Sequence, residues 1–156
     1  MERVPITPEG YKKLKKELHR LKTVERPQII KLIEEARAFG DLSENAEYES
    51  AKHRQGLIEG RIQELESKIS RAEIIDPSNL PNKDRVMFGV RVTIEETESG
   101  NTVSYQLVGP DESDPDKGLI SVTSPIGRAL LGKRVDDEVR VQTPSGIREF
   151  VILEIE

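Results

Sequence analysis

The sequence predicts an α+β protein in which an antiparallel α-helical coiled-coil hairpin is followed by a separate antiparallel β-sheet domain with one short helix. Within residues 1–75, apolar residues recur every three or four positions in two successive stripes. After residue 83 the period changes to two, which is typical of half-buried strands. Residues 76–82 are rich in turn formers and are expected to link the hairpin to a globular domain over 83–156.

The first helix is expected to begin at Pro8, because Thr7 can cap a helix and proline suits the first helical position. Pro27 removes one backbone hydrogen bond and should kink this helix. The apolar stripe along the helix consists of Tyr11, Leu14, Leu18, Leu21, Val24, Ile29, Ile33 and Ala36.

The second helix carries a matching stripe, made of Ile58, Ile62, Leu65, Ile69 and Ala72. Residues of the two stripes pair so that their numbers sum to 86 or 87, as in Leu21 with Leu65 or Ile29 with Ile58. A constant sum is what an antiparallel hairpin requires, because each step up one helix is a step down the other. The turn then falls near residues 40–45, and each arm should be about 40–48 Å long. Periodicity alone also allows a coiled coil that only dimerises or spaces other domains.

The second half of the chain reads as strands around one short helix. We expect strands over residues 86–94, 103–107, 120–122, 139–141 and 149–155. Ser124 and Pro125 resemble a helix cap and first position, and Gly132 should end the helix.

Charge and composition exclude several classes of function. The 156 residues carry a formal charge of −5; residues 1–75 hold 15 Lys and Arg against 14 Asp and Glu, and residues 76–156 hold 9 against 15. This acidity argues against a protein that grips duplex DNA by itself. The absence of cysteine rules out disulfides and thiolate metal sites. No apolar run approaches 18 residues, so we expect no membrane span and a cytoplasmic location.

The hairpin turn concentrates the residues that could carry chemistry. Asp41 and Glu44 stand three apart at the start of the second helix, a spacing that fits a capping box and also fits a pair of metal ligands. Behind them lie Arg37, Lys52, His53 and Arg54, which are either solvated helix charges or a small patch that contacts phosphate.

Two segments resemble the signatures of the bacterial Gre transcript cleavage factors, of the GreA type. Gly40-Asp41-Leu42-Ser43-Glu44-Asn45-Ala46-Glu47-Tyr48 is similar to the family's tip motif, and residues 120–133 are similar to its second signature. The resemblance implies an FKBP-like C-terminal domain that docks on RNA polymerase at the rim of the secondary channel. It also implies that Asp41 and Glu44 hold a second Mg²⁺ shared with the polymerase and promote cleavage of backtracked RNA.

By the same resemblance, Arg37, Lys52 and Arg54 would contact the 3′ end of the extruded RNA, and Ser43, Asn45 and Tyr48 would support the tip. The free protein would hold no cofactor, would not be a nuclease by itself and would be a monomer. Two alternatives stay open: a regulator that enters the same channel without promoting cleavage, and a prolyl isomerase.

Overall fold

The computed structural model describes residues 2–38, 46–79 and 84–156, and these separate into two compact units. One unit comprises Tyr11–Arg71, and the other comprises Met1–Gly10 with Ala72–Glu156. Within the described ranges, no helix is both long and apolar enough to cross a membrane.

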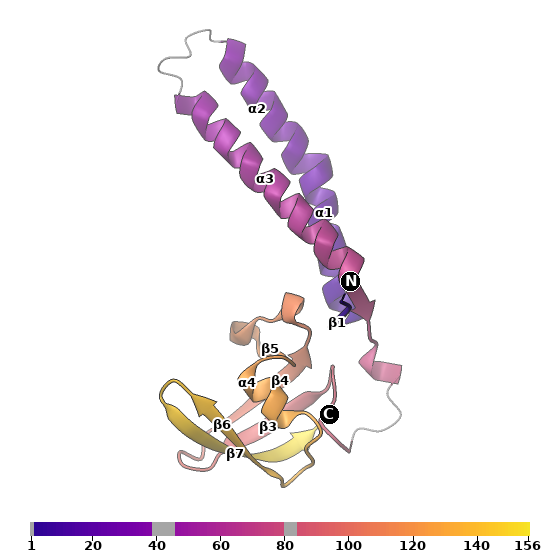
Figure 1. Cartoon of the computed structure of the whole chain (residues 1–156), viewed down its shortest axis with the longest axis vertical. Helices are drawn as coiled ribbons and strands as arrows, with labels where there is room; N and C mark the ends of the chain where they lie inside the picture. Colours follow the sequence, from indigo (N-terminus) through magenta and orange to yellow (C-terminus); the bar gives the residue numbers. More distant parts are fainter. Residues whose placement is uncertain (1, 39–45, 80–83) are drawn as a thin grey trace. The chain divides into compact units, whose positions relative to one another are not determined.

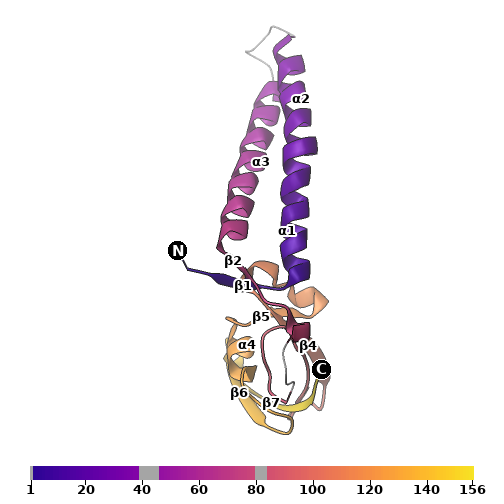
Figure 2. The same cartoon turned by 90° about the vertical axis from the view of Figure 1, so that its right-hand side faces the viewer.

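The first unit is a pair of long helical arms that run side by side in opposite directions (Figures 1 and 2). The first arm consists of α1 (Pro8–Arg20), a π-helical turn η1 (Leu21–Glu25) and α2 (Arg26–Ala38), and the second arm is α3 (Ala46–Arg71). A cluster of four buried isoleucines joins α2 to α3: Ile29, Ile33, Ile58 and Ile62. Leu18, Leu21, Tyr48 and Ala51 pack against it, so the predicted apolar seam is confirmed over this stretch.

Where the sequence predicted a kink at Pro27, the structure shows a π-helical turn that ends at Glu25, two residues before Pro27. Because Pro27 has no N–H and its ring would crowd the carbonyl of Thr23, the regular hydrogen-bond pattern cannot continue through this segment. The chain widens there instead, and the Arg26 N–H donates to the Leu21 carbonyl five residues back. Val24, which the sequence places in the apolar stripe, is 41% exposed and is not part of the isoleucine cluster, so this part of the predicted stripe is wrong.

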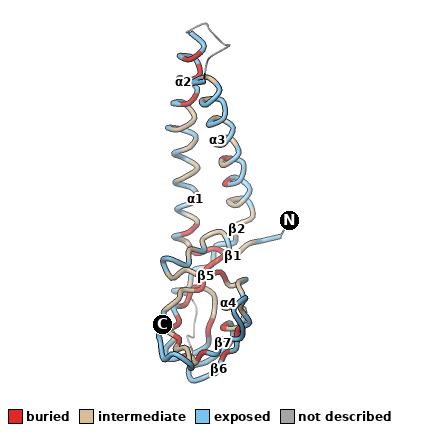
Figure 3. The backbone as a smooth tube through the Cα atoms, turned by 90° about the vertical axis from the view of Figure 1, so that its left-hand side faces the viewer, coloured by how far each residue is buried: buried red, intermediate tan, exposed pale blue. Residues whose placement is uncertain are grey.

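The second unit contains a mixed five-stranded sheet in the order β5-β4-β3-β7-β6. Its strands and helix are β3 (Arg91–Glu96), β4 (Thr102–Val108), β5 (Leu119–Ser121), α4 (Pro125–Leu130), β6 (Glu138–Thr143) and β7 (Gly146–Ile155). Buried residues of the curled sheet and of α4 (Figure 3) form one core together with two valines that precede β3. Its members are Val86, Val90, Val92, Ile94, Leu107, Ile120, Leu130, Val139, Val141, Phe150 and Ile152.

Two details of the sheet differ from the prediction. β5 pairs parallel to β4, because two short 3₁₀ turns, η3 (Pro110–Glu112) and η4 (Pro115–Lys117), turn the chain back before β5 begins. The strand expected over residues 86–94 starts only at Arg91, since Gly89 adopts a left-handed φ of 88° that no regular strand contains. The remaining strand pairs are antiparallel as predicted.

The helix caps were predicted correctly. The Gly10 N–H donates to Thr7 Oγ1 at 3.1 Å, and α1 begins at Pro8. The Gly127 N–H donates to Ser124 Oγ at 3.0 Å, with Pro125 opening α4 and Gly132 following it at a φ of 82°.

The second unit also contains a two-stranded parallel pair that the sequence did not reveal. β1 (Val4–Ile6) pairs with β2 (Ala72–Ile74), the segment that directly follows α3. A short 3₁₀ helix, η2 (Pro77–Asn79), lies in the segment expected to be a linker.

Candidate functional site

The candidate site is the end of the hairpin where α2 finishes and α3 begins. Asp41, Ser43, Glu44 and Asn45, four of the residues singled out from the sequence, lie outside the described residues. Arg37, Tyr48, Lys52 and Arg54 are described, and their placement follows from the two helices that carry them.

Tyr48 joins the last described turn of α2 to the first turn of α3. Its half-buried ring packs against the isoleucine cluster. The guanidinium carbon of Arg37 lies 5.8 Å from the centre of this ring, a distance at which a cation is attracted to an aromatic face. Arg37 and Tyr48 thus bridge the two helices just behind the predicted tip.

Arg37 and Lys52 lie on the same flank of the hairpin. Both line a shallow hollow of about 220 Å³ together with Ile30, Ile33, Glu34 and Gln55. Lys52 Nζ donates to Gln55 Oε1 at 3.2 Å, which holds the ammonium beside the hollow. This flank therefore offers two positive charges with one carboxylate, Glu34, among them.

Arg54 lies on the other flank and is separated from this pair. It lines a hollow of about 530 Å³ whose other residues are Ile29, Leu32, Glu35, Ala36, Ala46, Glu47, Ser50 and Ala51. Its guanidinium donates to Glu25 Oε2 at 3.2 Å. The predicted patch of Arg37, Lys52 and Arg54 is therefore divided between two flanks, and one of its three charges is already paired.

Ion pairs between the two arms of the hairpin fix the register in which the arms pack, and so the position of the site. The Arg61 guanidinium donates two hydrogen bonds to Glu17, at 2.7 and 2.8 Å, and Arg26 donates two to Glu59, also at 2.7 and 2.8 Å. Lys22 and Glu66 form a further pair at 3.2 Å. Each exposed pair contributes little stability, but a slip of one residue would break several of them together.

These pairs shift the ionisation of their carboxylates. The hydrogen bonds from Arg61 hold the pKa of Glu17 below its ordinary value of 4.5, and those from Arg26 lower the pKa of Glu59 in the same way. The pKa of Glu64 is lowered by Lys68 and then by Arg61. These carboxylates therefore stay charged in mildly acidic solution.

The second unit contains a set of contacts that the sequence reasoning missed. The Glu112 carboxylate accepts hydrogen bonds from the Thr7 N–H at 2.8 Å, from the Thr7 hydroxyl and from the Gly109 N–H at 3.0 Å. Thr7 is only 3% exposed, so Glu112 fastens the residues at the start of α1 to η3. The sequence signal was the turn-forming run Gly109-Pro110-Asp111-Glu112, but nothing in it points to a partner about a hundred positions away.

Two glycines make this junction possible. A Cβ on Gly109 would lie 1.9 Å from the Pro5 carbonyl oxygen, and one on Gly10 would lie 2.3 Å from Glu112 Oε1. Neither position therefore has room for a larger residue while these contacts persist.

Metal binding by described residues alone is not indicated. Across residues 2–38, 46–79 and 84–156 no three His, Asp or Glu side chains gather where they could hold an ion. The predicted ligands Asp41 and Glu44 are not among those residues, so their geometry stays a prediction.

Comparison with known proteins matches both halves of the chain to one family. The model described as "Transcription elongation factor, N-terminal" matches residues 4–74, and the model described as "Transcription elongation factor, GreA/GreB, C-term" matches residues 81–156.

Individual relatives match along the full length. The transcription elongation factors GreA of Verminephrobacter eiseniae and Syntrophobacter fumaroxidans are each 56% identical over 155 residues, which is 99% of this chain and 98% and 99% of theirs. The crystal structure of GreA factor homolog 1 of Thermus thermophilus is 34% identical and covers 99% of both chains, with a TM-score of 0.46.

Proposed function

Because the chain belongs to the GreA/GreB family of transcription elongation factors, we propose that it enters the secondary channel of RNA polymerase and stimulates the polymerase's own cleavage of backtracked RNA. The observation that carries this proposal is the tip motif of residues 40–48, placed by the sequence between two helices that form a slender hairpin. The globular unit would dock at the rim of the channel.

The proposed chemistry depends on Asp41 and Glu44. Their two carboxylates supply oxygen ligands, which are the ligands Mg²⁺ prefers, but Mg²⁺ takes about six oxygens in near-octahedral geometry. Two carboxylates on a narrow hairpin leave most of these positions to be filled by a partner. We therefore propose that the pair completes a site in the polymerase, where a second Mg²⁺ can lower the pKa of a bound water and stabilise the leaving oxygen.

The residues behind the tip would position the RNA. Arg37 and Lys52 share one flank, so they are the better pair to contact a single phosphate group of the extruded 3′ end. Arg54 would act on that strand only after leaving Glu25, and its contribution to RNA contact should be the smallest of the three.

The same reasoning implies that the free protein is not a nuclease. Two carboxylates in water lack the remaining metal ligands and a positioned substrate. Tyr48 would act indirectly, by holding Arg37 and the start of α3 in place.

A cleavage assay on a backtracked polymerase–RNA complex tests the proposal. The protein, Mg²⁺ and a complex carrying a 3′-labelled transcript are mixed, and the release of short 3′ fragments is followed. We expect Asp41→Ala and Glu44→Ala to slow fragment release by about 100-fold or more, because each removes several kcal/mol of transition-state stabilisation through the metal. Binding to polymerase, measured by competition with the labelled wild type, should stay within a few-fold.

Glu49→Ala is the matched control, since Glu49 is an exposed carboxylate in the first turn of α3 that the tip pair does not include. It should leave cleavage unchanged. If the wild type released no fragments but slowed elongation, and Asp41→Ala did the same, the protein would be a regulator that occupies the channel without promoting cleavage.

A further inference from the structure

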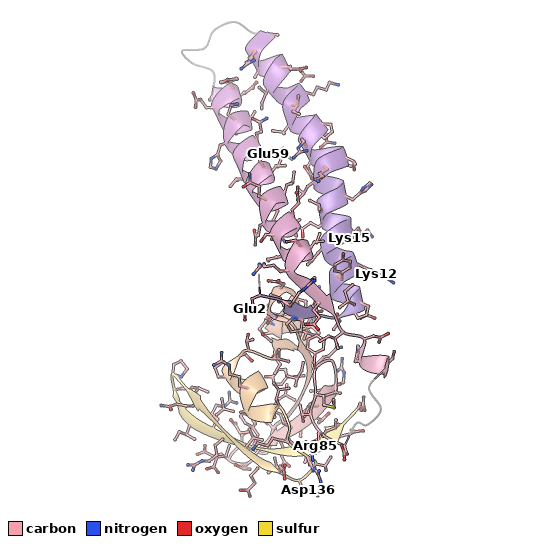
Figure 4. The ribbon with its side chains drawn as sticks, turned by 45° about the vertical axis from the view of Figure 1, so that its right-hand side comes forward. Glu2, Lys12, Lys15, Glu59, Arg85 and Asp136 are labelled. Atoms are coloured by element: carbon pink, nitrogen blue, oxygen red, sulfur yellow. The ribbon has the colours of Figure 1, made fainter. Side chains whose placement is uncertain are left out.

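One strongly charged face of the hairpin has no role in the function proposed above. It is the outer surface of α1, where Lys12, Lys13, Lys15 and Lys16 follow one another within five positions. All four side chains are exposed, and Leu14 between them is buried. Figure 4 shows Lys12 and Lys15 on the side of α1 that faces away from α3.

These lysines differ from five other basic residues of the same hairpin, which are paired with carboxylates. Lys22, Arg26, Arg54, Arg61 and Lys68 each lie within 4.0 Å of a carboxylate. Among the described residues, no carboxylate lies within ion-pair distance of the four lysines of α1. This face therefore carries four positive charges within five positions and has one exposed carboxylate nearby, Glu9, which forms no ion pair with them.

The composition of this face favours phosphate as its ligand over a protein surface. Protein interfaces are depleted of lysine and are built around buried aromatic and apolar anchors. The exposed large apolar side chains of the described hairpin begin only at Val24, so none belongs to α1. Phosphate backbones, in contrast, are bound through lysine and arginine charges without any need for an apolar centre.

The geometry of this lysine face favours single-stranded nucleic acid over a duplex. Lys12 and Lys16 are four residues apart and so lie about 6 Å apart along a single convex helix about 10 Å wide. Tyr11 lies beside them, half-buried, with Lys15 Nζ 5.5 Å from the centre of its ring. Positive side chains next to an aromatic ring are the usual means of holding single-stranded nucleic acid, where the ring stacks on a base.

We propose that the Tyr11–Lys16 face of α1 binds the phosphate backbone of single-stranded RNA. The choice of RNA over DNA rests on the proposed function, which brings the protein to a transcript. The face is separate from the predicted tip patch, since twenty residues lie between Lys16 and Arg37.

Fluorescence anisotropy with the free full-length protein and a labelled 12-nucleotide RNA tests this proposal, at a series of salt concentrations between 50 and 200 mM. The variant K12Q/K13Q/K15Q/K16Q should bind at least about tenfold more weakly at 50 mM salt, and its salt dependence should be shallower by about 3 in log K against log salt, or about 0.7 for each lost contact. Replacing the four lysines with arginine should retain binding. Tyr11→Leu should weaken it several-fold, because the stacking platform is lost.

A second quadruple variant removes the same total charge elsewhere. Arg85, Arg91, Lys117 and Arg140 are exposed residues of the globular unit, and changing them to glutamine should leave RNA binding unchanged. Circular dichroism verifies that each variant keeps the helical content of the wild type.

The proposal fails if the lysine variant binds as well as the wild type, if both glutamine variants lose binding equally, or if polyglutamate displaces the RNA at equal charge concentration. It also fails if duplex RNA, or DNA of the same sequence, binds more than tenfold more tightly. Polymerase is absent from this assay, so its outcome is independent of whether Asp41 and Glu44 support cleavage.

Discussion

The contacts of Glu112 support a quantitative prediction about how the start of α1 is held. Its carboxylate accepts from two backbone N–H groups and one hydroxyl, all in a region where Thr7 is almost completely buried. Glu112→Ala removes the acceptor and leaves these donors without a partner. Each unsatisfied buried donor costs about 1–3 kcal/mol, so allowing for partial access of water we expect a loss of about 3–5 kcal/mol.

Amide hydrogen exchange measured by NMR reports this loss of stability at the individual residues that Glu112 contacts. The amides of Thr7 and Gly109 should exchange at least about 100-fold faster in Glu112→Ala, because a loss of 3 kcal/mol in local stability corresponds to more than two powers of ten in the opening equilibrium. The amides of α3 that bond within the helix should change much less. Urea unfolding followed through the sheet should show the same direction of change.

Two variants make the prediction discriminating. Glu154→Ala removes an exposed carboxylate from β7 and should leave exchange at Thr7 unchanged. Glu112→Gln keeps the side-chain shape but replaces one acceptor oxygen with a donor, so it should lie between the wild type and Glu112→Ala. Exchange at Thr7 within about threefold of the wild type in Glu112→Ala would refute the assignment of this carboxylate as the fastening point.

Three further predictions concern other parts of the chain. The folded-state pKa values of Glu17 and Glu59 lie below 4.5, so the stability that their ion pairs give the hairpin is present above that pH and is lost as the pH falls below it. The helical circular dichroism signal should therefore be lost at a lower temperature at pH 3 than at pH 6. This difference should be smaller in the variant Glu17→Gln/Glu59→Gln. Asp136 has a left-handed φ of 73°, so Asp136→Ala should lower the free energy of unfolding by about 1 kcal/mol while Asp136→Gly should not, as chemical denaturation would show. Removing residues 22–28 and 58–64 together shortens the hairpin by about 10 Å. This deletion should abolish transcript cleavage and leave the affinity for polymerase within a few-fold of the wild type. Retained cleavage would mean that the length of the hairpin does not determine whether the tip acts.

The sequence predicted the coarse fold and the class of protein because both depend on local patterns. The matched stripes, the caps at Thr7 and Ser124 and the change of period after residue 83 each reflect one helix or strand burying one face. The similarity to the Gre factors was carried by two contiguous motifs and is confirmed by the family matches over residues 4–74 and 81–156.

The tertiary structure decided what depends on residues that are distant in the chain. The parallel pairing of β1 with β2 and of β4 with β5, and the contacts of Glu112 with Thr7, join segments that no local period relates. The same is true of the predicted RNA patch: Arg37, Lys52 and Arg54 look like one cluster in sequence. Their division between two flanks follows from the angle at which each side chain leaves its helix, and that angle has meaning only once the two helices are packed.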